Sequence, residues 1–138
     1  MMAIALIVAL ARGAALAAPD TFSDGSPRHC KPSPTRRAAA VCVRFTRKFG
    51  EVAFAIDKKY GRADARSHSA PFLLLSVENL ALAGECLAGA HDRKDAEKFF
   101  DHAMDGLLAI KSIRGAPEWV RRQAGADIKS VGRDLAQL

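Results

Sequence analysis

Three cysteines, Cys30, Cys42 and Cys86, are the residues of this chain best suited to chemistry. In an oxidising compartment two of them can form a disulfide, and the third then remains as a thiol. The Cys-x-x-Cys spacing of disulfide oxidoreductases is absent. His29 and Cys30 are adjacent, but neighbouring residues of an irregular arm provide neither an oriented base nor an oxyanion hole for a Cys–His nucleophile.

The acidic residues and histidines match no catalytic or metal-binding pattern. A metal centre in a helical bundle needs Glu-x-x-His pairs, and no His stands three positions after Glu78, Glu85, Glu97 or Glu118. Glycine-rich phosphate loops and nucleophile elbows are also missing. We therefore predict a protein that is not an enzyme, with no catalytic residue, no metal and no cofactor.

Residues 1–18 have the composition of a secretory signal peptide. They are rich in Ala, Leu, Ile and Val and end in a small-x-small sequence before Pro19. No basic residue precedes the apolar core, and Arg12 interrupts it, so an ordinary N-terminal helix is the alternative. We predict a signal peptide over 1–18, cleaved after Ala18, and a periplasmic or secreted protein.

A change of composition at residue 36 separates an arm from a folded domain. Residues 19–35 contain four of the six prolines and show no periodicity, which predicts a flexible arm. Residues 36–138 form the predicted helical domain. Its first helix follows Thr35, a suitable N-cap, and ends at Gly61. Its apolar stripe has the 3- and 4-residue spacing of one helix face and comprises Ala38, Cys42, Phe45, Phe49, Val52, Ile56 and Tyr60.

Three further helices complete the predicted domain. After a loop over 61–69, Pro71 is suited to the first turn of a helix that runs to about Ala90. This helix is apolar on nearly all sides and belongs in the middle of a bundle. The third helix is capped by Asp92 and ends at Gly115, and the fourth opens at Pro117. Trp119, at the start of the fourth helix, is expected to anchor the core.

We therefore expect an all-α fold: a four-helix antiparallel bundle of two helical hairpins, after a cleaved or flexible N-terminal segment. The short connections favour antiparallel neighbours. The sequence contains no period-two run of β-branched residues bounded by turns, the pattern that would indicate a strand.

The hairpin geometry favours a disulfide between Cys42 and Cys86. With the turn centred near residue 65, Cys42 lies 23 residues before the centre and Cys86 lies 21 after it. Equal rise per residue then puts both at one height. Cys30 would remain as a free or intermolecular thiol. Two alternatives stay open: Cys30 pairs with either of the others, or Cys42 and Cys86 are buried and reduced.

One segment resembles a single tetratricopeptide repeat. The residues that carry the resemblance are Leu80-x-x-Ala83-Gly84-x-x-Leu87, then Ala96-x-x-x-Phe100 and Ala103. The pattern covers about a quarter of the chain and does not recur one repeat length upstream or downstream. We interpret it as the packing pattern of a helical hairpin.

The positive charge is concentrated in the first helix. The chain has a net charge of +6, and residues 36–62 hold eight Lys and Arg against two acids. Such a face suits an acidic protein partner or an anionic membrane or cell-surface polymer, and it is also compatible with a merely solvated helix. If the chain is exported, nucleic acid is not an expected partner. We predict a non-catalytic protein-binding module (an adaptor, inhibitor or immunity-type protein) that binds through Arg44, Arg47, Lys48 and Lys58.

Overall fold

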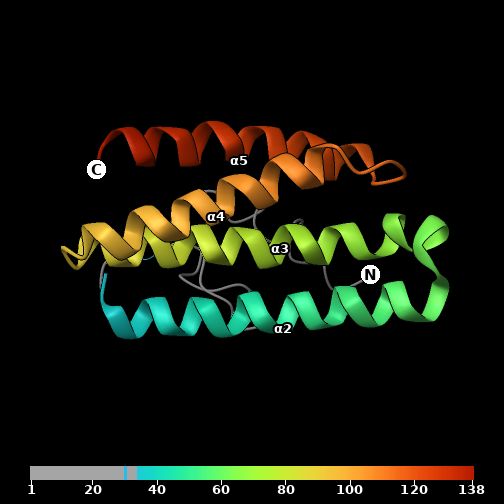
Figure 1. Cartoon of the computed structure of the whole chain (residues 1–138), viewed down its shortest axis with the longest axis horizontal. Helices are drawn as coiled ribbons and strands as arrows, with labels where there is room; N and C mark the ends of the chain where they lie inside the picture. Colours follow the sequence, from blue (N-terminus) through green and yellow to red (C-terminus); the bar gives the residue numbers. More distant parts are fainter. Residues whose placement is uncertain (1–29, 31–33) are drawn as a thin grey trace, which may run out of the picture.

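The computed structural model describes Cys30 and residues 34–138, except for the side chains of residues 62–66. The predicted signal peptide and most of the predicted arm lie outside this part. Four helices follow one another along the chain: α2 (Arg36–Tyr60), α3 (Arg62–Gly89), α4 (Arg93–Lys111) and α5 (Glu118–Ala136) (Figure 1). The described residues contain no strand. The prediction of an all-α four-helix bundle is confirmed.

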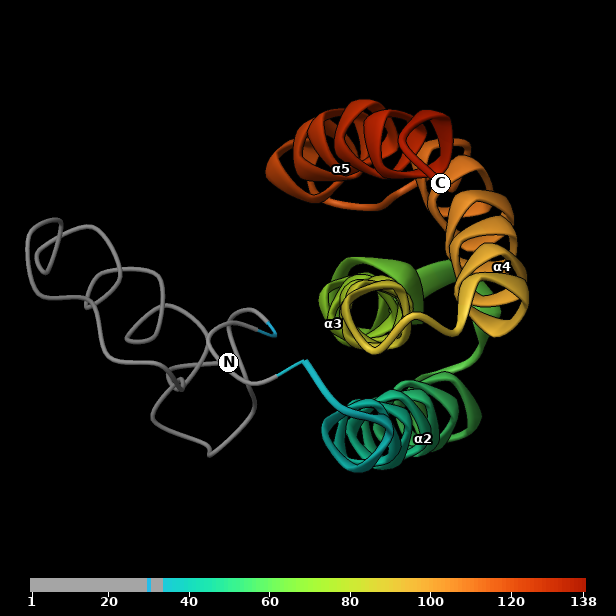
Figure 2. The same cartoon turned by 90° about the vertical axis from the view of Figure 1, so that its left-hand side faces the viewer.

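Helix α3 is the centre of the arrangement. It packs against α2, α4 and α5, whereas α2 packs against α3 alone among the described helices. Figure 2 shows α2 and α5 on opposite sides of α3, with α4 beside both α3 and α5. Each helix runs antiparallel to the next, so α3 and α5 run in the same direction (Figure 1).

Two predicted N-caps are confirmed. The Thr35 Oγ1 accepts a hydrogen bond from the Ala38 N–H at 3.0 Å, and the Asp92 carboxylate accepts a longer one from the Asp95 N–H at 3.4 Å. Both side chains satisfy a backbone donor that the first helical turn leaves without an intrahelical partner. Arg36 approaches Asp92 at 3.3 Å, so the start of α2 lies next to the start of α4.

The connection between α2 and α3 differs from the prediction. The predicted loop over 61–69 is wrong, because α3 begins at Arg62 and only Gly61 separates the two helices. Gly61 has a φ of 77°, a conformation that costs little only for glycine. Pro71 therefore lies inside α3, not in its first turn. The missing N–H of Pro71 removes one intrahelical hydrogen bond.

Small residues and a reciprocal hydrogen-bond pair join α2 to α3. The buried residues of α2 are Ala39, Cys42, Phe49 and Ala53. Between the helices, Thr46 Oγ1 donates to the Ser76 carbonyl at 2.9 Å, and Ser76 Oγ donates to the Thr46 carbonyl at 2.7 Å. Each hydroxyl thus finds an acceptor across the interface, as a buried polar group requires. The contact also fixes the height of α2 on α3.

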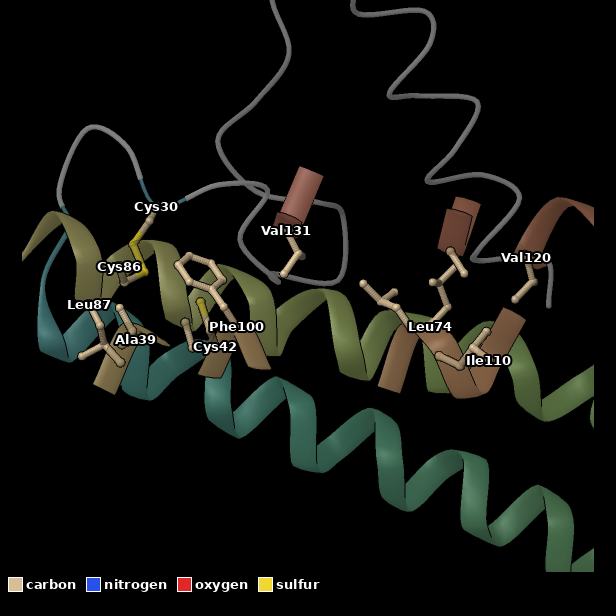
Figure 3. Close-up of a cluster of buried hydrophobic side chains, with 14 of the residues drawn as sticks. Cys30, Ala39, Cys42, Leu74, Cys86, Leu87, Phe100, Ile110, Val120 and Val131 are labelled. Carbon is tan, nitrogen blue, oxygen red and sulfur yellow. A yellow bond between two sulfur atoms is a disulfide. The ribbon is translucent and has the colours of Figure 1, made fainter. Parts of the chain in front are cut away.

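Glycines allow α3 and α4 to approach closely. A Cβ added at Gly84 would lie 2.8 Å from the ring of Phe100, and one added at Gly106 would lie 2.8 Å from Val77. The Phe100 ring is buried in the core (Figure 3). These contacts give a physical reason for the Gly84 and Phe100 spacing in the segment that resembles a helical repeat.

Helix α5 covers the other side of the core through Val120, Ala124 and Val131, all of which are buried. Trp119 is 47 % exposed, so the expectation that it anchors the core is wrong. It directly precedes Val120, and successive residues of a helix point in different directions. Val120 therefore occupies the inward position instead.

The segment Ser67–Gly89 of α3 is long and apolar enough to cross a membrane, judged by length and composition alone. A central helix of a soluble bundle has the same character, because neighbouring helices cover it on several sides. In this structure, α3 occupies that central place.

We expect Gly84→Ala to lower the free energy of unfolding by about 1–3 kcal/mol, because the added methyl group overpacks the contact with Phe100. Gly125→Ala is the matched control. Gly125 also lies within a helix, and nothing lies within 4 Å of its added Cβ, so this change should be neutral or stabilising by up to about 1 kcal/mol. Denaturant titration of both variants measures the difference. Equal stability of the two would contradict the close approach.

Candidate functional site

The structure pairs Cys30 with Cys86, and the two Cα atoms are 5.2 Å apart (Figure 3). This separation is usual for a disulfide. The prediction of a Cys42–Cys86 bond is therefore wrong, and so is the prediction that Cys30 is the free thiol. The pairing of Cys30 with one of the other cysteines was the open alternative.

The position of the turn between α2 and α3 explains why the wrong cysteine pair was predicted. Counted from Gly61, Cys42 is 19 residues away and Cys86 is 25 residues away. The difference of 6 residues corresponds to about 9 Å along the helix axis. Cys86 is therefore level with the start of α2, and it is bonded there to Cys30. The bond joins residues 56 apart in sequence and stabilises the fold by about 4 kcal/mol in the chain-entropy model.

Cys42 is a buried free cysteine with 1 % of its surface exposed. Burial, with a smaller effect of the negative charge of Glu85, raises the pKa of the Cys42 thiol to about 11. Since the thiolate is the reactive form, Cys42 is inert at neutral pH and acts as a small apolar core residue.

The basic residues of α2 share its outward face. Arg44, Arg47, Lys48 and Lys58 are all exposed, as are Arg37 and Lys59. Glu51 is the one acid among the exposed residues of α2. At 100° per residue this set lies opposite the buried positions that contact α3. The structure thus places the four predicted partner-binding residues on the outward face of α2, with the acid Glu51 between Lys48 and Lys58, and we call this face the basic surface.

Two aromatic side chains project from the same helix. Phe54 is 70 % exposed and Tyr60 is 53 % exposed, the highest values among the large apolar residues that the structure describes. Tyr60 lies against His68 of α3, with ring centroids 5.9 Å apart. Phe54 lies on the flank of the basic surface, one helical turn from Lys58. Aromatic and arginine side chains are enriched in protein contact surfaces.

A second candidate site is a cleft between α3 and α5 with a volume of about 190 Å³. Its walls are apolar at Leu75, Leu82, Leu107 and Val131. Its polar lining carries four carboxyl groups and no basic residue: Glu78 and Glu85 of α3, and Asp127 and Asp134 of α5. We call it the acidic cleft.

Glu78 and Asp127 form a coupled pair across the acidic cleft. Burial, followed by a hydrogen bond to Asp127 and the negative charge of Asp127, raises the pKa of Glu78 well above 4.5. Two neighbouring carboxyl groups with little water cannot both ionise cheaply, so Glu78 holds its proton to a higher pH than an exposed glutamate does. Asp127 Oδ1 accepts a hydrogen bond from Gln123 at 2.9 Å, whereas the buried Oδ2 has no donor among the described residues unless Glu78 carries that proton.

Besides Glu78 and Asp127, the polar lining contains Glu85, Asp134, Asn79 and Ser130. Burial raises the pKa of Asp134, although Arg133 acts in the opposite direction. Asn79 is 3 % exposed. Its amide nitrogen donates to the Leu75 carbonyl at 2.9 Å, and its buried Oδ1 has no donor among the described groups. The acidic cleft therefore contains acceptors in excess of donors.

Sequence reasoning considered Glu78 and Glu85 only for metal-binding motifs and did not identify the acidic cleft. One signal was present: Glu78 and Glu85 are seven residues apart, and so are Asp127 and Asp134. Seven residues are close to two helical turns, so each pair lies on one face. Within the described part of the chain, no three acidic, His or Cys side chains are grouped closely enough for a metal ion.

We expect a single thiol, Cys42, to react with an alkylating reagent, and only after unfolding. Intact mass should show no adduct on the native, non-reduced protein at pH 8 and one adduct in denaturant. Peptide mapping should place that adduct on Cys42 because Cys30 and Cys86 are joined. An adduct on Cys30 would contradict the pairing. A Cys42→Ser variant, which keeps the disulfide, provides the matched control with no adduct.

The raised pKa of Glu78 makes stability depend on pH. Because the folded state holds the Glu78 proton more tightly than the unfolded state, stability falls as pH rises from about 4.5 through the folded pKa. Glu78→Gln cannot titrate and keeps a donor for Asp127, so this part of the decrease should be lost. Unfolding titrations between about pH 4 and pH 8 measure it. The control is Glu97→Gln, at an exposed position of α4. Parallel curves for the wild type and Glu78→Gln would contradict the coupling.

Comparison with known proteins assigns no function to the basic surface or to the acidic cleft. No protein-family model, no curated protein and no solved structure matches the chain. The candidate functions therefore rest on the basic surface of α2, the acidic cleft and the cysteines alone.

Proposed function

We propose that this chain is an exported, non-catalytic module that binds a protein with an acidic surface through the outward face of α2. The observation that carries the proposal is the placement of α2. It packs against α3 alone, and its remaining surface presents Arg44, Arg47, Lys48 and Lys58 together with an exposed Phe54.

The arrangement supports binding in two ways. A cluster of like charges accelerates encounter with a surface of opposite charge and disfavours basic partners. Phe54 offers apolar area whose burial a partner would favour, because 70 % of the side chain is exposed to water. Lys48 also lies over the Phe45 ring at 5.7 Å, so part of the basic surface is held against the helix.

Two observations support export. Residues 1–18 have the composition of a signal peptide. The Cys30–Cys86 disulfide belongs to the kind of bond that persists in oxidising compartments and is rare in the cytosol. A periplasmic or secreted location is consistent with both.

The second candidate is attachment to an anionic membrane or cell-surface polymer through the same face. Exposed Phe54 and Tyr60 beside Lys58 and Lys59 favour it, since aromatic and basic side chains together suit the membrane interface. The two candidates differ in whether lipid alone is sufficient for binding.

Photo-crosslinking from the exposed Ala40 of α2, in a producing cell, tests the proposal. The secreted or periplasmic protein should begin at Pro19 and form an adduct with one acidic protein. Arg44→Glu with Arg47→Glu should abolish the adduct and leave the thermal midpoint unchanged, because both residues are exposed. Lys94→Glu with Lys98→Glu, an equal charge change on exposed positions of α4, is the control and should keep it.

An adduct that survives the α2 reversal would refute the protein-binding proposal. Vesicles containing phosphatidylglycerol separate the second candidate. Salt-sensitive binding of the purified protein, lost on the α2 reversal, supports membrane attachment, and no binding at low salt removes it.

A further inference from the structure

The acidic cleft has acceptors that the described residues do not satisfy. Asn79 Oδ1 is buried and has no donor, and Asp127 Oδ2 is buried and depends on a proton at Glu78. A buried acceptor without a donor destabilises the fold, so folded proteins rarely retain one without a reason. Both atoms belong to residues that line the same cleft. They point to a ligand that donates hydrogen bonds.

We propose that the acidic cleft binds an organic cation, a protonated amine on an apolar stem. The ammonium group would donate to Asn79 Oδ1 and to the Glu78 and Asp127 carboxylates. The stem would lie against Leu75, Leu82 and Val131, as the methylene stem of a lysine lies on apolar surface. This site is separate from the basic surface of α2, and it does not depend on the function proposed for that surface.

The lining favours an amine over a metal ion or a large ligand. Hard cations such as Ca²⁺ need six to eight oxygen ligands around one point, whereas the carboxyl groups of this lining are spread over two helical turns of α3 and of α5. Within the described residues, no metal-binding group of three acidic, His or Cys side chains occurs. The cleft volume of about 190 Å³ is smaller than the pockets that hold drug-sized molecules.

The carboxyl groups form two levels along the cleft. Helices α3 and α5 run in the same direction (Figure 1). Glu78 with Asp127 therefore forms one level, and Glu85 with Asp134 forms the next. The seven-residue separation puts the levels about 10 Å apart. Glu85 and Asp134 also line the neighbouring hollow beside Cys30, whose volume is about 540 Å³. A ligand with two amines at that spacing would reach both levels.

Binding must displace the proton that the Glu78–Asp127 pair retains. The titratable groups that line the cleft are Glu78, Glu85, Asp127 and Asp134, while Arg133 of α5 acts on Asp134 and no basic group of α4 lines it. An ammonium ion favours the ionised pair, so binding strengthens as pH rises and releases a proton. A ligand that needs protonated carboxyl groups would show the opposite pH dependence: its binding would weaken as pH rises.

Isothermal titration calorimetry of the disulfide-bonded protein tests the proposal with an eight-carbon diamine and, as the neutral control, the eight-carbon diol. We expect saturable binding of the diamine, weaker binding of the four-carbon diamine and none of the diol. Affinity should rise between about pH 5 and pH 8, with a buffer-dependent enthalpy that reports proton release.

Two variants connect binding to the cleft. Asp127→Asn should weaken binding of the diamine by about tenfold or more, the effect of losing one charged hydrogen bond. Asp101→Asn, at an exposed position of α4, is the matched control and should have no effect.

Lysine side chains of a protein segment could supply the same amine groups as a free diamine. A capped peptide with lysine at both ends of two alanines tests this second source. Its binding, with the same dependence on Asp127, would assign the site to a basic peptide segment, and binding of the diamine alone would assign it to a free amine.

Three results would overturn the proposal: no binding of either amine probe at pH 8 and low salt, equal binding of the diol, or unchanged affinity in Asp127→Asn. The outcome is independent of the α2 crosslinking. If the acidic cleft binds the diamine and no α2 adduct forms, only the protein-binding proposal is refuted. If the adduct forms and no amine binds, only the proposal for the acidic cleft is refuted.

Discussion

The close packing of α3 against its neighbours determines the remaining structure. At its contact with α4, Gly84 leaves no room for a side chain beside Phe100. At its contact with α2, Thr46 and Ser76 exchange hydrogen bonds, which fixes the relative height of the two helices. Interiors at crystal-like density tolerate no slippage of such contacts. The position of Cys86 opposite Cys30 and the position of Glu78 opposite Asp127 both follow from where α3 is held.

The packing also separates the charges. The outward surface of α2 is basic, while the carboxyl groups of α3 and α5 gather in the acidic cleft on another side of α3. A helix with a single packed neighbour keeps most of its surface in water, where lysine and arginine cost little. Carboxyl groups between two helices lose water and must share protons or find cations. The two surfaces therefore differ in chemistry as well as in sign.

Local features of this fold were predictable from sequence, and non-local ones were not. Thr35 and Asp92 act on the next turn of chain, so composition and spacing were sufficient to identify both caps. The end of the first helix at Gly61 was predicted, but the start of α3 at Arg62 was not, because the small polar residues after Gly61 suit either a loop or a helix. That error shifted the register of the hairpin and produced the wrong cysteine pair.

The acidic cleft was not predicted for the same reason, because its two sides are far apart in the sequence. Glu78 and Asp127 are 49 positions apart in the sequence, and they meet only because α4 returns the chain so that α5 runs beside α3. The sequence also did not show which of the neighbours Trp119 and Val120 is buried. Both are apolar neighbours at a helix start, and the rotation of α5 on the bundle decides which one is buried.

The sequential packing of the helices also determines how the chain can fold. Each helix contacts the next one along the chain, and the contact of α3 with α5 is the one non-sequential helix pairing among the described helices. Contacts between segments close in sequence require little loop-closure entropy and are associated with rapid folding. The α2–α3 hairpin, joined by one glycine, can form as a unit before α5 is made. Thiol oxidation takes seconds to hours, so the bundle can bring Cys30 and Cys86 together before the bond exists, and the disulfide then secures a fold that is already complete.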